Sequence, residues 1–129
     1  MPERTAFATW EGNLREGRGT MQIGKGFFEG PYTYASRFED GTGTNPEELI
    51  AAAHAGCFSM AFSADLGRAG YTPKRISTRA VVSLGKVDGK SRITQIHLET
   101  EAEIPDIDAG TFAEIAEAAK NGCPVSNAL

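Results

Sequence analysis

The two cysteines are the residues best suited to carry chemistry in this chain of 129 residues. Cys57 and Cys123 are far apart in the sequence and form no Cys-x-x-Cys motif. The glycine-rich motifs of nucleotide-binding proteins, the GxSxG motif of serine hydrolases and the HExxH motif of zinc proteases are all missing. The sequence therefore points to sulfur chemistry, with a structural role for either thiol as the alternative.

Cys57 needs a nearby cation to be reactive. Burial raises the pKa of a thiol above its ordinary value of about 8.5, and the helix dipole fades within the first turn. Lowering that pKa to about 6 requires about 3.4 kcal/mol, and one guanidinium about 4 Å away in an effective dielectric near 20 supplies about 4 kcal/mol. Arg37, His54 and the arginines scattered elsewhere in the chain are candidate cations. The residues alone favour Arg37 as an exposed charge at a strand end, and they leave open that Cys57 is a small buried hydrophobe.

Cys123 has a different environment, because Asn121-Gly122 precede it and Pro124 follows it. Asn-Gly is typical of a helix end, and proline is favoured in the first turn of a helix. We therefore expect Cys123 to cap a helix whose free amide groups favour the thiolate. A purely structural role for this cysteine stays open.

The segment that holds Cys57 begins with a strong helix-start signal. Residues 44–48, Thr-Asn-Pro-Glu-Glu, offer a cap, a proline for the first turn and an acidic residue three positions after either cap. We expect a helix from this start to about Gly67 or Gly70. Apolar residues cover nearly every side of residues 49–66, so this helix is predicted to be central and buried all round.

Strands are predicted on both sides of this helix. In the first third, β-branched and aromatic residues favour strands at 5–10, 19–23 and 32–37, with turns at 11–18 and 24–30. After the helix, alternating apolar residues predict strands at 76–84 and 96–104, joined by a turn at Asp88-Gly89. Asp108 then caps a helix with one apolar face. The predicted class is α+β with antiparallel sheets.

Composition limits the kind of partner. The chain has 13 Lys plus Arg against 17 Asp plus Glu, a net charge of −4, and no basic run, which argues against nucleic acid and anionic membranes. No apolar stretch is expected to approach the roughly 20 residues that span a bilayer, and the start lacks a signal-peptide core. We therefore expect a cytoplasmic protein with one domain over residues 1–129.

Two cysteine-centred segments have distinctive sequences. Residues 45–58 are Asn-Pro-Glu-Glu-Leu-Ile-Ala-Ala-Ala-His-Ala-Gly-Cys-Phe, and residues 120–126 are Lys-Asn-Gly-Cys-Pro-Val-Ser. In these motifs the chain resembles the OsmC/Ohr family of thiol peroxidases. Residues 10–12 and 37–39 resemble the OsmC branch, as does His54, where the Ohr branch usually has tyrosine. The family normally continues into a last strand after the second cysteine helix, which we expect to be absent or truncated before Leu129.

The resemblance implies an OsmC-like fold, an intertwined homodimer and the reduction of organic hydroperoxides without a cofactor or metal. By motif, Cys57 matches the peroxidatic sulfur and Cys123 the resolving sulfur. Arg37 matches the arginine that activates the thiolate, and Glu47 the carboxylate that orients this arginine. The resemblance also implies a dithiol reductant, of which a lipoylated protein is the expected form. Apolar walls that include Phe58 and Met60 are expected to favour alkyl or lipid hydroperoxides over hydrogen peroxide.

Helix geometry adds a hypothesis about Glu47. It lies ten residues before Cys57, which corresponds to about 15 Å along a straight helix. We therefore expect each active site to take Glu47 from the partner subunit. The alternative is that Glu47 only closes a capping box.

Two other functions use the same residues. His54, Cys57, His97 and Cys123 form a nominal Cys2His2 set for a metal, although His97 alternates with apolar residues and is expected to point to solvent. A redox sensor without catalytic turnover is the other alternative. Metal analysis separates the first from a peroxidase, and steady-state turnover separates the second.

Overall fold

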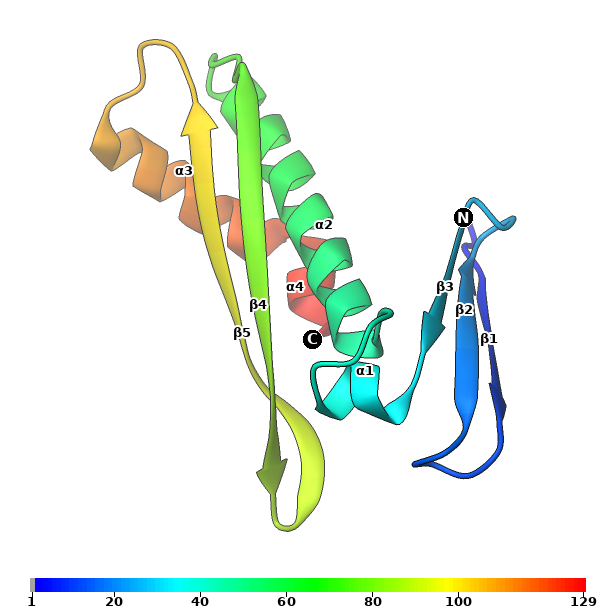
Figure 1. Ribbon diagram of the computed structural model, residues 1–129. Coiled ribbons are helices and arrows are strands. Elements are labelled where there is room, and N and C mark those ends of the chain that lie inside the picture. The colour runs from blue at the N-terminus through cyan, green and yellow to red at the C-terminus, as the bar shows by residue number, and fades with distance from the viewer. Residues whose placement is uncertain (1) are drawn as a thin grey trace. The chain divides into compact units, whose positions relative to one another are not determined.

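The computed structural model describes residues 2–129 and contains two antiparallel sheets and a long helix (Figure 1). The chain divides into an N-terminal unit that ends at Leu49 and a C-terminal unit that starts at Ile50. The elements in chain order are β1 (Ala6–Glu11), β2 (Arg18–Ile23), β3 (Phe28–Tyr32), α1 (Tyr34–Phe38), α2 (Pro46–Arg68), β4 (Arg75–Val87), β5 (Lys90–Glu103), α3 (Ala109–Gly122) and α4 (Pro124–Ala128).

The N-terminal unit is an antiparallel sheet in the order β1-β2-β3, followed by α1. Gly19 of β2 pairs with Trp10 of β1 and Tyr32 of β3. A Cβ atom at this glycine would lie 2.7 Å from both neighbouring rings, so no side chain fits there. The rings of Trp10 and Tyr32 pack with centroids 5.3 Å apart. The two rings therefore pack beside Gly19, where the sheet has room only for glycine.

The third predicted strand is wrong in its position. Residues 28–32 form β3, and the residues that follow form the short helix α1 instead of continuing as a strand. The cause is a capping box: the Thr33 hydroxyl accepts from the Ser36 amide at 3.1 Å, and the Thr33 amide donates to the Ser36 hydroxyl at 2.8 Å. Arg37 therefore lies in a helix and not at a strand end.

Helix α2 begins where the sequence predicts. The Asn45 side chain accepts a hydrogen bond from the Glu48 amide at 2.8 Å, and Pro46 occupies the first turn. The Asn45 amide group also donates to the Ser36 carbonyl at 2.9 Å, which ties the start of α2 to α1. At its other end, the helix stops at Arg68, two residues before Gly70 with φ of +91°.

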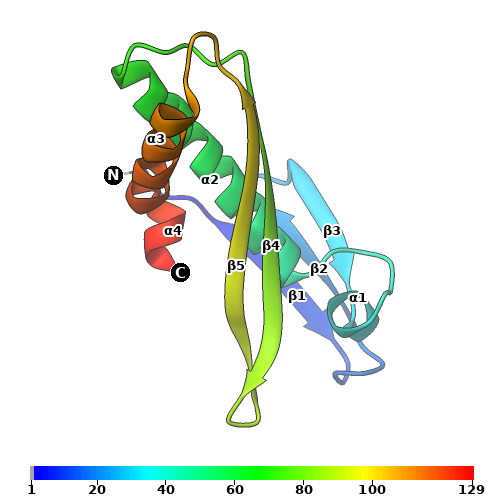
Figure 2. The same cartoon turned by 90° about the vertical axis from the view of Figure 1, so that its left-hand side faces the viewer.

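In the C-terminal unit, β4 and β5 form a long hairpin, and the helices lie on one face of it (Figure 2). The two turn residues, Asp88 and Gly89, have φ of 53° and 78°, as a tight hairpin turn requires. The register shifts by one residue between Ser83 and Leu84. This hairpin confirms the two strands expected after the central helix, and each is longer than predicted.

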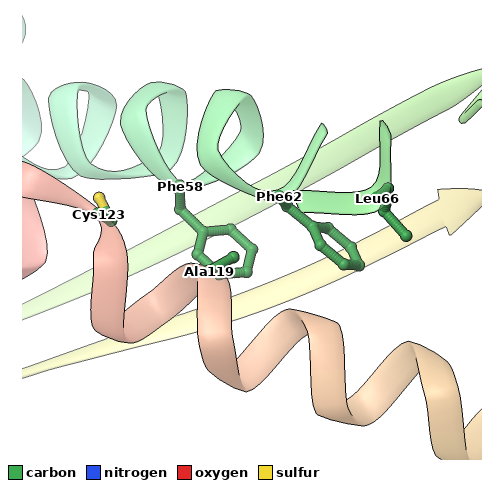
Figure 3. Packing of buried hydrophobic residues seen from close by; sticks show 5 residues of the cluster. All are labelled: Phe58, Phe62, Leu66, Ala119 and Cys123. Carbon is green, nitrogen blue, oxygen red and sulfur yellow. The ribbon is translucent and has the colours of Figure 1, made fainter. Parts of the chain in front are cut away.

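The core of the C-terminal unit joins α2 to α3 (Figure 3). Phe62 is fully buried, and its ring meets Phe112 of α3 edge-on with centroids 5.3 Å apart. The side chains that form the buried cluster are Phe58, Phe62, Leu66, Ala119 and Cys123. Cys123 is thus part of the core.

The prediction that α2 is buried all round is wrong for the single chain. Its buried residues recur every four positions along one face: His54, Phe58, Phe62 and Leu66. Met60, on another face, is 77% exposed. Helix α2 therefore has more apolar side chains than a single chain buries.

By length and composition alone, α2 is also apolar enough to cross a membrane, with a mean hydropathy of 1.3 over 18 residues. The expectation that no apolar stretch approaches that length is therefore wrong. A core helix of a folded domain meets the same criterion, and α2 supplies three of the five core residues named above.

Candidate active site

The two cysteines meet within one chain, although 66 positions separate them. Cys57 lies in the middle of α2, and Cys123 caps α4 directly after α3. Their Sγ atoms are 2.9 Å apart, and both thiols are free. Because a disulfide bond is about 2.05 Å long, the sulfurs need to approach by only about 0.9 Å to join. The pair is therefore placed for reversible disulfide formation.

The two thiols differ in acidity. Burial raises the pKa of Cys57, and the contact with Cys123 raises it further, against a smaller lowering by the Val125 amide. Burial also acts to raise the pKa of Cys123, but the contact with Cys57 and the polar groups of Ser126 and Val125 in the first turn of α4 outweigh it. The net pKa of Cys123 lies below its ordinary value, as expected for a thiol at a helix start. With these contacts in place, Cys123 loses its proton at a lower pH than Cys57 does.

Arg37 and Glu47 form a two-point ion pair in the N-terminal unit. Arg37 donates from Nε at 3.1 Å and from Nη2 at 3.0 Å to the two oxygens of the Glu47 carboxylate. The parallel bonds fix the plane of the guanidinium. Asn45 caps the helix by accepting from the Glu48 amide. The Glu47 carboxylate takes no part in this cap and binds Arg37 instead. The pair thus lies in one unit, and the two cysteines lie in the other.

His54 lies one helical turn before Cys57, where it meets a residue that the sequence analysis had not singled out. Its Nε2 atom is 2.6 Å from the Ser126 hydroxyl of α4. Burial lowers the pKa of His54, which favours a neutral ring. Ser126 lies three residues after Cys123, the position at which a residue in the first turn of a helix reaches back to the cap, and this spacing was the available signal.

Other expected features are present only in part. Met60 is exposed, but Phe58 is 4% exposed and packs in the core, so the expected wall of aromatic side chains is not open. Within residues 2–129, no group of three or more His, Cys, Asp or Glu side chains is arranged to hold a metal ion. The nominal Cys2His2 set is therefore not gathered into one cluster.

The sequence is also similar to known proteins. The family model described as OsmC-like protein matches residues 39–129. The curated Peroxiredoxin OsmC of Escherichia coli strain K12 is 54% identical over 123 residues, which cover 95% of this chain and 86% of the relative. The chain belongs to the OsmC family.

More distant members of the OsmC/Ohr group agree. An Organic hydroperoxide resistance protein of Xanthomonas axonopodis pv. citri is 33% identical over 89 residues, which cover 68% of this chain and 61% of the relative. The crystal structure of the Organic Hydroperoxide Resistance Protein OhrB of Bacillus subtilis is similar with a TM-score of 0.71 and 28% identity. The match covers 96% of this chain and 89% of that one. The OsmC-like fold, with antiparallel sheets and a long cysteine-bearing helix, is confirmed.

The family-model match contains Glu47, Cys57 and Cys123, and Arg37 lies two residues before it. The matched segment of this OsmC family member also contains His54 and Ser126. The candidate site therefore lies mostly in the part of the chain that carries the family likeness.

Proposed function

We propose that this chain is a peroxidase that uses its two thiols to reduce organic hydroperoxides to alcohols. The observation that carries the proposal is the 2.9 Å separation of the Cys57 and Cys123 sulfurs within one chain. The names of two relatives support the class of reaction: Peroxiredoxin OsmC and Organic hydroperoxide resistance protein.

In the first step, the Cys57 thiolate attacks the terminal oxygen of the hydroperoxide. The O–O bond breaks, the sulfur becomes a sulfenic acid, and the alkoxide takes up a proton to leave as an alcohol. The sulfur loses two electrons and the peroxide gains them. Because burial raises the pKa of Cys57, this step needs an external cation next to the sulfur.

We assign that cation to Arg37, with Glu47 holding its guanidinium in a fixed plane. Glu47 lies ten residues before Cys57 on α2, a helical rise of about 15 Å. Since Arg37 and Glu47 are bound to one another, the two move as one unit, and we propose that the partner subunit of a homodimer supplies both. The exposed apolar face of α2 supports such a dimer.

In the second step, the Cys123 sulfur attacks the sulfenic sulfur of Cys57. The S–S bond forms, the S–O bond breaks, and the released hydroxide combines with the proton of Cys123 to give water. An external dithiol, such as a lipoylated protein, then reopens the disulfide by two thiol exchanges and is itself oxidised. This cycle takes place without a cofactor or metal.

The test is turnover of cumene hydroperoxide with dihydrolipoamide, run beside hydrogen peroxide. We expect wild-type turnover with the organic peroxide, none in Cys57→Ser, and consumption of about one equivalent in Cys123→Ser, which stops as sulfenic acid. Ser59→Ala, on the same helix, is the control and should keep full activity. Multiple turnover by Cys57→Ser would contradict the assignment, and a single equivalent in the wild type would indicate a redox sensor.

A further inference from the structure

We infer that Phe38 is a positioning residue for Arg37, because its ring holds one face of the guanidinium while the Glu47 carboxylate holds one edge. The inference deepens the proposed function, on which it rests, by naming what keeps the activating cation in one orientation. All of the residues concerned lie in the N-terminal unit. In this role Phe38 acts only through Arg37.

The ion pair by itself holds the guanidinium to a side chain that is also flexible. Nε and Nη2 of Arg37 donate to the two oxygens of Glu47, at 3.1 and 3.0 Å. These bonds align the two planar groups, but each group is carried on a long side chain with several rotatable bonds. The Arg37 side chain is 37% exposed, so the packing around it is incomplete. A second contact is therefore needed to hold the pair in place.

The ring of Phe38 supplies this second contact. The Cζ atom of Arg37 lies 5.2 Å from the centroid of the Phe38 ring, within the distance at which a cation is attracted to an aromatic face. Arginine suits such a contact, because its planar guanidinium stacks on a ring while its edge still forms hydrogen bonds. Glu47 thus restrains rotation within the guanidinium plane, and Phe38 restrains movement out of it. We call Phe38 and Glu47 the arginine clamp.

The Phe38 ring is held in turn by a second ring. Tyr34 lies one helical turn before it on α1, and the two ring centroids are 5.0 Å apart. The guanidinium of Arg15, from the segment between β1 and β2, lies over the Tyr34 ring with its Cζ atom 4.6 Å from the centroid. Phe38 is 40% exposed, so these stacked contacts, and not burial, hold its ring.

Helix α1, which carries the ring and the arginine, is tied to the start of α2, which carries the carboxylate. The buried Ser36 hydroxyl donates to the Thr44 carbonyl at 2.7 Å. The Asn45 side chain donates to the Ser36 carbonyl at 2.9 Å. Because these bonds fix one helix to the other, the two halves of the arginine clamp keep a constant relation.

The arginine clamp leaves one end of the guanidinium free. A guanidinium has five N–H donors, and the bonds to Glu47 use one at Nε and one at Nη2. Nη1 of Arg37 is therefore the end available to the Cys57 sulfur or to the hydroperoxide in the proposed reaction. Donors that already point in the required direction need no reorganisation when the reaction occurs.

The first test follows the Arg37 side chain by NMR in the full chain. The Nε–H resonance of Arg37 is identified by its absence in Arg37→Lys. We expect its exchange with water to become about threefold faster in Phe38→Leu, which keeps an apolar side chain but removes the aromatic face. Phe38→Tyr keeps that face and should restore the wild-type exchange rate. An unchanged rate in Phe38→Leu would overturn the inference.

Phe28→Leu is the matched control. Phe28 lies on β3 in the same unit and is 41% exposed, against 40% for Phe38. In the part of the chain that the structure describes, no arginine stacks on its ring. The exchange rate of Arg37 in this variant should equal that of the wild type. An equal acceleration in Phe28→Leu would indicate a general loosening of the unit and would also overturn the inference.

The second test compares the reaction rates with cumene hydroperoxide and hydrogen peroxide. A poorly oriented cation slows both reactions, so Phe38→Leu should lower both rates by the same factor, about threefold, and Phe38→Tyr should restore both. A decrease confined to cumene hydroperoxide would mean that Phe38 contacts the organic group instead. That result, or unchanged rates with both peroxides, would contradict the positioning role.

The two tests separate this inference from the proposed function, because the exchange measurement needs no peroxide. A wild-type protein without turnover would refute the proposed function, while an exchange rate that depends on Phe38 would still support the arginine clamp. Turnover together with an exchange rate that is independent of Phe38 would refute the arginine clamp and leave the proposed function intact.

Discussion

At the scale of single residues, two thiols of the same type are made chemically different by groups within a few ångströms. Cys123 lies at the start of α4, where its net pKa lies below the ordinary value of a thiol. Cys57 lies inside α2, where burial and the neighbouring sulfur favour its neutral form. The proposed division of labour between the thiols therefore requires an added positive charge at Cys57 and none at Cys123.

Replacing Arg37 with lysine tests the proposed source of that charge. Lysine keeps the charge but cannot form two parallel bonds to Glu47. We expect the rate of reaction with cumene hydroperoxide to fall about tenfold, the equivalent of one pKa unit at Cys57. The free energy of unfolding should change by less than about 1 kcal/mol, because the Arg37 side chain is 37% exposed.

The matched control for this variant is Arg79→Lys on β4. Arg79 is also paired with a carboxylate, that of Glu99, but its side chain is 73% exposed and lies on the hairpin. The reaction rate of this control should equal that of the wild type. Equal rates for both lysine variants would contradict the role of Arg37.

Sequence alone singled out the two cysteines as candidates, and the structure brings their sulfurs together. Cys57 and Cys123 were singled out by their residue type and because the sequence lacks the other catalytic and nucleotide-binding motifs. Arg37 was a candidate cation from its position alone, but its role and that of Glu47 were assigned only through family likeness. Ser126 was missed because it contacts His54 across 72 positions, and the only signal in the sequence was its place three residues after Cys123.

At the scale of elements, the sulfur pair depends on how α3 is held against α2. Cys123 follows α3 directly, so the packing of Phe62 against Phe112 and of Ala119 against its neighbours fixes where the second sulfur lies. The capping residue Asp108 and the apolar face of α3 were both predicted and are confirmed. The packing of the core therefore sets the positions of the two sulfurs, and the candidate site lies at the edge of this core.

Removing the Phe62 ring tests this dependence. Phe62→Ala deletes a fully buried side chain and its edge-on contact with Phe112, so we expect a loss of about 3–5 kcal/mol in the free energy of unfolding. Urea denaturation measures this loss. Phe27→Ala, at a position 101% exposed, is the control and should change stability by less than about 0.5 kcal/mol. Equal effects would contradict the core assignment.

The predicted elements differ in how well local sequence determined them. The start of α2 was predicted correctly because Asn45 and Pro46 act within one turn. The strand expected at 32–37 was wrong because the capping box between Thr33 and Ser36 outweighs the strand preference of the aromatic residues nearby. A short-range hydrogen-bond pattern thus prevailed over composition.

At the scale of the whole molecule, one chain leaves apolar surface uncovered. The uncovered side of α2 contains Met60 and several small side chains, which are Ala52, Ala53, Gly56 and Ala64. The apolar pattern predicted burial on every side of α2, whereas the single chain buries only one side. The proposed homodimer supplies a second copy to cover this face.

Met60→Asp tests the dimer. In a lone chain this position is 77% exposed, so the substitution should be tolerated, whereas a dimer would bury an unpaired charge. We expect light scattering to show a dimer for the wild type and a shift toward monomer for the variant. Leu14→Asp, at a position 60% exposed, is the control and should stay dimeric. A wild-type monomer would contradict the homodimer.

The separation of the two sulfurs along the chain has a consequence for the oxidised protein. A bond between them would close a loop of about 66 residues, half the polypeptide, and would restrict the conformations open to the denatured ensemble. In the chain-entropy description, this restriction is worth roughly 4 kcal/mol. The oxidised form would then resist heat and proteolysis better than the reduced form. The protein would therefore be most stable while it waits for its reductant.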